Sequence, residues 1–140
     1  MFRKYLFFYL IIFISNFSVF AQSDQVGDRL NKLFVLCFTD NYKAASKYIV
    51  YRGADTTRKW KDVYNFENED EKKEVISVCK EIKSYLEEGG DYELTDFTEE
   101  EESEGVWYVW LVEFKKGTHK KVHFAFLKIG KKYALGDIDQ

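Results

Sequence analysis

The spacing of apolar residues changes once along this chain, at Gly89-Gly90. Before the glycines, apolar residues recur every three to four positions, as they do on one side of a helix; after them, apolar residues alternate, as in a strand. Helices followed by a run of strands form the α+β pattern, in which the helices pack on one face of an antiparallel sheet. We therefore expect three N-terminal helices packed on a curved four-stranded antiparallel meander.

Three segments before the glycines have helical spacing. These expected helices cover residues 26–38, 42–50 and 68–89. Asn68 and Glu71 have the spacing of a capping box, in which the amide accepts from a free backbone N–H and the glutamate reaches back. The intervening segment 51–66 is polar and has few large apolar residues. We expect it to wrap over an opening in the fold.

Four segments after the glycines have strand character. They cover residues 92–98, 106–114, 122–129 and 133–138, and their short connections predict antiparallel neighbours. If the loop between the second and third strands has an odd number of residues, Trp110 shares a face with Phe124 and Phe126, and His123 lies near Glu113 on the other face. An even number exchanges the two sets. We favour the odd loop because it gathers the bulky side chains on one face.

Both faces of the second strand, "GVWYVWLVEF", are largely apolar, so both faces need a covering. The helices can provide one covering. Three candidates remain for the other covering: a second subunit, a ligand or segment 51–66. The aromatic side chains either fill the core or line a ligand pocket. The candidates for ligand contact are Tyr108, Trp110, Phe124, Phe126 and Tyr133.

The first 21 residues have the features of a cleavable signal peptide. Arg3 and Lys4 precede an apolar run that ends at Val19-Phe20-Ala21, which suits a signal peptidase. Polar residues interrupt the run, so it falls short of the roughly 20 apolar residues that an uncleaved membrane anchor needs. We expect cleavage after Ala21, which leaves one domain of residues 22–140, without a membrane segment, that is secreted or periplasmic.

The charge of that domain excludes one class of partner. Arg3 and Lys4 account for two of the 21 basic residues, so the remaining chain has 19 basic and 24 acidic side chains, a formal charge of −5. Because the phosphates of nucleic acid would repel this excess of negative charge, we expect no nucleic-acid partner.

Cys37 and Cys79 are the two cysteines of the chain, and each lies on the apolar face of an expected helix. An oxidising compartment permits a disulfide between them, although buried free thiols also pack well as small apolar groups. Neither cysteine has the further ligands of a metal site or the basic surroundings of a nucleophile. We therefore expect no metal and no cofactor.

The order of two helices, a variable segment, a long third helix and a meander resembles the nuclear transport factor 2-like superfamily, a cystatin-like α+β cone. The closing "GKKYALGDID", residues 130–139, is similar to the last strand of small exported bacterial members. The resemblance implies a pocket between the helices and the concave face of the sheet, and a dimer interface on the other face. The partners it implies are a second copy of the chain, a small apolar ligand or an envelope protein.

Enzymes of that superfamily, such as ketosteroid isomerases and scytalone dehydratase, place a carboxylate or histidine in the pocket as a base. The strand residues of this chain that could act as the base are His123, Glu113, Asp96 and Asp137, with Tyr108 or Tyr133 as a hydrogen-bond donor. None lies in a matching motif. We therefore expect an exported, non-catalytic binding or interaction module. The alternatives are a small isomerase- or dehydratase-like enzyme and a structural accessory of the cell envelope.

Overall fold

The computed structural model describes residues 2–140, with side chains described from Phe20 onward. The helical elements are α1 (Phe2–Phe38), α2 (Tyr42–Ala45), a short 3-10 helix η1 (Ser46–Tyr48) and α3 (Glu69–Gly89). They precede the strands β1 (Tyr92–Glu102), β2 (Gly105–Phe114), β3 (Lys121–Ile129) and β4 (Lys132–Asp139). The strands form one antiparallel sheet in the order β1-β2-β3-β4, so the chain has the expected α+β order of helices before a meander.

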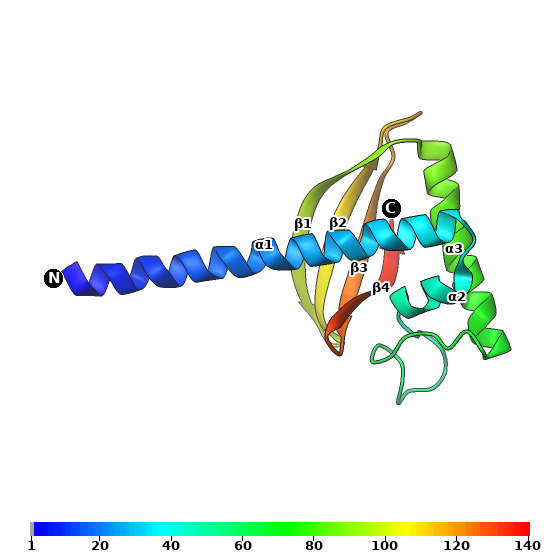
Figure 1. Ribbon diagram of the computed structural model, residues 1–140, viewed down its shortest axis with the longest axis horizontal. Coiled ribbons are helices and arrows are strands. Elements are labelled where there is room, and N and C mark those ends of the chain that lie inside the picture. The colour runs from blue at the N-terminus through cyan, green and yellow to red at the C-terminus, as the bar shows by residue number, and fades with distance from the viewer. Residues whose placement is uncertain (1) are drawn as a thin grey trace.

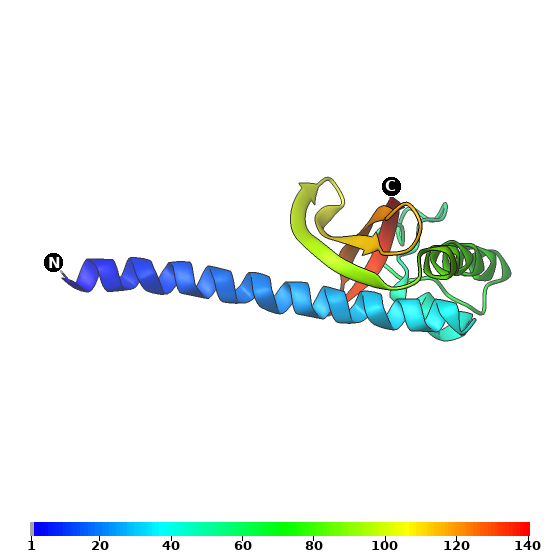
Figure 2. The same cartoon turned by 90° about the horizontal axis from the view of Figure 1, so that it is seen from above.

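Helix α1 crosses the sheet, and its first half projects beyond the sheet (Figures 1 and 2). The expected cleavage point after Ala21 lies inside this unbroken helix. Among the helices in the described part of the chain, none is both long enough and apolar enough to cross a membrane. The part of α1 that packs in the domain buries an apolar stripe at helical spacing. That stripe consists of Val26, Leu30, Leu33, Phe34 and Cys37.

The second expected helix is shorter than its spacing predicts. Asn41 begins α2 by accepting a hydrogen bond at its side chain from the Ala44 N–H, and the helix continues as η1 only to Tyr48. Ile49 and Val50 are extended instead, and the Val50 N–H donates to the Leu135 carbonyl at 2.8 Å. The expected helical end at Val50 is therefore wrong, because these β-branched residues pair with the edge of the sheet.

Helix α3 begins and ends as expected, but its capping box is incomplete. The Asn68 side chain accepts from the backbone N–H of Asp70 at 3.0 Å and of Glu71 at 3.1 Å. The Glu71 carboxylate does not return to Asn68; it binds Arg58 and the Asn65 N–H. A charged donor is a stronger partner than a neutral N–H, which explains why this half of the prediction is wrong.

The register of β2 and β3 confirms the odd loop. Trp110 pairs with Phe124 and Leu111 pairs with His123, so the bulky aromatic side chains share one face. Strand β1 continues to Glu102, beyond its expected end near Thr98, because the long β2 gives it a pairing partner along this whole length. The four glutamates at residues 99–102 therefore lie in this strand.

The inner face of the sheet packs on the helices and forms the main core. Phe114, Phe124 and Phe126 are its largest fully buried side chains. Phe34 of α1 meets Phe124 edge to face, with ring centroids 5.1 Å apart, and Tyr85 of α3 stacks on Phe114 at 5.8 Å. Helices α1 and α3 thus cover the aromatic face.

The outer face carries a second, smaller apolar cluster. It consists of Val50, Trp107, Val109, Leu127 and Ala134, with Trp60 and Val63 packed against it. The rings of Trp60 and Trp107 meet edge to face with centroids 5.5 Å apart. Gly136 of β4 leaves room for Trp107, because a side chain there would collide with the indole ring. Segment 51–66 is therefore the covering of this cluster.

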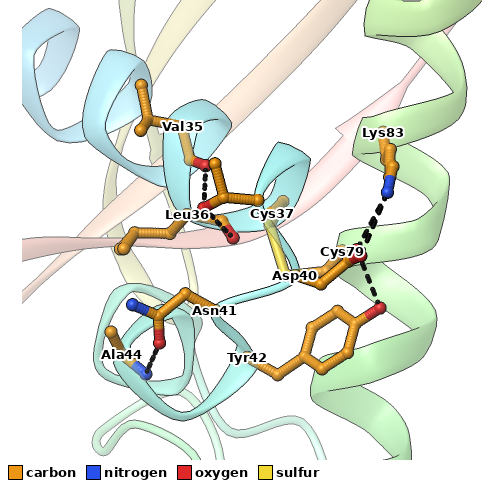
Figure 3. The surroundings of a disulfide bond; sticks show 10 residues. Val35, Leu36, Cys37, Asp40, Asn41, Tyr42, Ala44, Cys79 and Lys83 are labelled. Carbon is orange, nitrogen blue, oxygen red and sulfur yellow. Dashed lines mark hydrogen bonds and ion pairs between the residues drawn. A yellow bond between two sulfur atoms is a disulfide. The ribbon is translucent and has the colours of Figure 1, made fainter.

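A disulfide joins Cys37 at the end of α1 to Cys79 in the middle of α3 (Figure 3). The two Cα atoms are 4.7 Å apart, and both side chains are fully buried. Beside it, Asp40 receives hydrogen bonds from the Lys83 ammonium at 3.0 Å and the Tyr42 hydroxyl at 3.1 Å. A disulfide in a domain of this size fits an extracellular location, where the surroundings are oxidising.

Candidate functional site

The five aromatic residues expected to contact a ligand lie in the main core. Phe124 and Phe126 are fully buried, and Tyr108 meets Tyr133 edge to face with centroids 5.1 Å apart. Trp110 is half-buried, and its Nε1 donates to the Ser23 carbonyl at 3.2 Å. These side chains line neither of the two described cavities. Contact between them and a ligand stays a prediction.

Three of the four candidate bases, His123, Glu113 and Asp96, do not meet in a cavity. His123 is exposed on the outer face, and Asp96 is exposed beside an irregularity in β1. The nearest basic partners of Glu113 are His119, whose Nδ1 lies 3.7 Å from the carboxylate, and Lys115, whose Nζ lies 3.9 Å away. Lys121 lies opposite Glu113 in the register and His123 lies opposite Leu111, and no ion pair joins His123 to Glu113 among the described residues. None of the three candidates lines either described cavity.

A cleft of about 790 Å³ lies between α3, the outer edge of β4 and the start of segment 51–66. We call it the α3–β4 cleft. Its floor is buried and mostly apolar, and comprises Ile49, Tyr51, Tyr64 and Leu135. Its remaining lining residues are Arg52, Gly53, Ala54, Asn68, Asp70, Glu71, Glu74, Val78, Glu81, Gly136, Asp137 and Ile138. Most of these are exposed at the rim, so the cleft is open to solvent.

The α3 wall of the cleft is one acidic face of the helix. Glu71, Glu74, Val78 and Glu81 all line the cleft, and their spacing of three and four residues places them on one side. The same helix presents its apolar side, which includes Val75, to the core. The helix therefore packs through one side and offers carboxylates on the neighbouring side.

The β4 wall is the edge of a strand and not one of its faces. Four consecutive residues, from Leu135 to Ile138, line the cleft. Successive side chains of a strand point to opposite faces, so a cavity lined by four in a row must run along the edge. The last strand of the sheet supplies this edge because the meander ends with β4.

The tyrosines of the floor have their hydroxyl groups occupied. The Tyr64 hydroxyl accepts from the Arg52 N–H at 3.3 Å, and the Tyr51 hydroxyl accepts from the Asp55 N–H at 3.2 Å. Burial raises the pKa of Tyr64, which keeps its phenol neutral. Gly53 allows the Tyr51 ring to lie against the chain, because a side chain there would overlap the ring. The floor is therefore an aromatic surface that segment 51–66 holds in place.

An ion-pair network attaches segment 51–66 to the first turn of α3. Arg58 donates to both Glu71 carboxylate oxygens, at 2.7 and 3.2 Å, and its Nε donates to Asp62 at 2.9 Å. The hydrogen bonds from Arg58 lower the pKa of both carboxyl groups, and the hydrogen bonds that Arg58 donates to Glu71 and Asp62 in turn raise the pKa of Arg58. The guanidinium also lies 4.2 Å from the centre of the Tyr51 ring. Glu71 thus has a structural role and its charge is neutralised.

The remaining charges of the cleft are unbalanced. Besides Glu71, four carboxylates line it, whereas Arg52 is its one basic residue. Arg52 donates to the Gly136 carbonyl at 3.0 Å and to the Asp137 carboxylate at 3.3 Å. Within the described residues, Glu74 and Glu81 have no basic partner, and Glu81 only accepts from the Tyr85 hydroxyl at 3.3 Å. The cleft therefore attracts positive charge.

Sequence reasoning missed this cleft, apart from naming Asp137 as a residue on the last strand. Two signals were present in the sequence. Glu74 and Glu81 lie on the same side of the third helix as the apolar Val78. The last strand of a meander has an unpaired edge. The sequence does not show that this face and this edge come together. Among the described residues, no group of three or more histidines, cysteines or carboxylates could hold a metal ion.

Comparison with known proteins adds no relative to this description. No family model, no curated protein and no solved structure matches the chain. The cleft is therefore interpreted from its own geometry.

Proposed function

We propose that this protein is an exported, non-catalytic binding module that holds a cationic ligand in the α3–β4 cleft. The observation that carries the proposal is the pair of uncompensated carboxylates, Glu74 and Glu81, beside a buried aromatic floor. The volume of about 790 Å³ lies in the range of known ligand sites. An amine or guanidinium with an apolar stem would satisfy both features, because its charge meets the carboxylates and its stem covers the floor.

A binding role accounts for the cleft better than catalysis does. The carboxylates at its rim are exposed to solvent, and no histidine lines the cleft. Of the four candidate bases, His123, Glu113 and Asp96 lie outside it, and Asp137, which lines it, is paired with Arg52. The isomerase- or dehydratase-like alternative has no group of residues in the described structure to support it.

Membership of the nuclear transport factor 2-like superfamily is part of the proposal and is supported by the order of helices before a meander. In that superfamily the pocket lies between the helices and the concave face of the sheet. In this chain, Phe34, Phe124 and Phe126 fill that space. The proposed site is accordingly displaced to the edge of β4. Export, which the disulfide supports, belongs to the same proposal.

The test is calorimetric titration with spermidine and with lysine amide. We expect both to bind, and we expect the Glu74→Gln/Glu81→Gln double variant to bind roughly fivefold more weakly, because each exposed ion pair contributes up to about 1 kcal/mol. The matched control is Glu87→Gln/Glu88→Gln, which removes the same charge from the same helix outside the cleft. Absence of binding by both probes, or equal weakening by the control, would show that the proposal is wrong.

A further inference from the structure

We infer that the ligand of the α3–β4 cleft is an extended basic polypeptide segment, which pairs with the outer edge of β4 as an additional strand. The inference rests on the proposed function and specifies its ligand. A free cation would use the carboxylates alone, whereas a polypeptide would also use the backbone of the sheet edge. Three features of the cleft favour the polypeptide.

The first feature is the unpaired edge. In the part of the chain that the structure describes, no strand follows β4 in the sheet, and the backbone pairs with its outer edge only at Leu135, through Ile49 and the Val50 N–H. In the described residues, no backbone group pairs with this edge from Gly136 to Ile138. An edge of this kind is a template for another strand, and here it lies inside a cleft.

The second feature is Arg52, which shows what contacts the edge accepts. Its guanidinium places an N–H donor on the Gly136 carbonyl and a positive charge on the Asp137 carboxylate. A backbone N–H and a basic side chain of a bound segment would supply the same two interactions. The Arg52 side chain is 47% exposed, so it can leave the edge without uncovering the core.

The third feature is the spacing of the carboxylates on α3. Asp70 and Glu74 are four residues apart, or about 6 Å along a helix. Alternate residues of a strand are about 6.6 Å apart, so basic residues at every second position match this interval. The other alternate set would contact the apolar floor of the cleft, at Tyr51 and Tyr64. The cleft therefore suits a segment in which basic and apolar residues alternate.

The test uses a fluorescein-labelled hexapeptide of alternating lysine and valine, and two versions in which either the lysine or the valine backbone nitrogens are methylated. In an added strand, only one alternate set of N–H groups faces β4. We expect methylation of one set to weaken binding at least about tenfold and methylation of the other to have little effect. Anisotropy reports the binding. Arg52→Ala should tighten peptide binding, because it frees the edge, and weaker binding would contradict the role given to Arg52.

The outcomes separate this inference from the proposed function. If all three peptides bind equally, or if spermidine binds and the peptides do not, strand pairing is wrong and the cationic site stands. If neither spermidine nor any peptide binds, both are wrong. Weaker binding of the unmodified peptide to Glu74→Gln/Glu81→Gln, with unchanged binding to Glu87→Gln/Glu88→Gln, would place the bound peptide in the cleft.

Discussion

Replacing both cysteines by alanine should remove a large part of the stability of the fold. The disulfide joins residues 42 positions apart, and this loop contains α2, η1 and segment 51–66. Closing a loop of that length lowers the entropy of the unfolded chain by about 13 cal/mol/K. The Cys37→Ala/Cys79→Ala variant should therefore lose about 4 kcal/mol of its free energy of unfolding at 25 °C.

Urea denaturation followed by far-UV circular dichroism measures this loss. The variant should also show a larger dependence on urea, because its unfolded chain exposes more surface without the cross-link. Dithiothreitol should lower the stability of the wild-type protein and leave that of the variant unchanged. A loss below about 1 kcal/mol, with the same dependence on urea, would refute the reasoning that the cross-link constrains the unfolded chain.

Three further substitutions test the packing around the cleft and the core. Glu71→Gln should cost about 2 kcal/mol at pH 7, because Arg58 then loses one of its two carboxylate partners and keeps Asp62; since the folded-state pKa of Glu71 is lowered, the difference from wild type should be full above the ordinary value of 4.5 and shrink as pH falls through the lowered pKa, and a constant difference would contradict this. Gly89→Ala should cost about 1–3 kcal/mol in urea, because its Cβ would lie 2.5 Å from that of Phe114, and an unchanged midpoint would contradict the packing. Trp60→Ala should cost about 2 kcal/mol and expose the outer apolar cluster to a hydrophobic dye, whereas unchanged dye binding would show that segment 51–66 does not cover it.

Most of the fold follows from local patterns. The helical stripe ending at Cys37, the glycine stop at Gly90 and the alternation in β2 each depend on neighbouring residues, so the helices, the strands and the odd register could be predicted. The errors occur where a distant partner competes with a local preference. Val50 was expected in a helix but its N–H donates to the Leu135 carbonyl, and the Glu71 side chain was expected in the cap but accepts from Arg58.

The candidate site could not be predicted because it depends on the meeting of distant segments. Glu74 and Asp137 face one cleft, although they are far apart in the sequence and neither lies in a motif. The aromatic residues of β2 and β3 were predicted to contact a ligand because they are large. Large apolar side chains mostly fill cores, however, as Phe124 and Phe126 do. A glutamate on a helix usually faces solvent, so the position of Glu74 on the same side as Val78 does not by itself mark a binding site.

The most direct test of the central claim is a titration with the hexapeptide of alternating lysine and valine. Changes in the backbone amide shifts of the protein then locate the bound peptide. We predict that the largest shifts fall in residues 68–81 of the α3 region and residues 135–138 of β4, the two walls of the α3–β4 cleft. Amides around His123 on the outer face should stay unchanged. Shifts confined to the outer face, or absent from both walls, would contradict the claim that this cleft is the binding site.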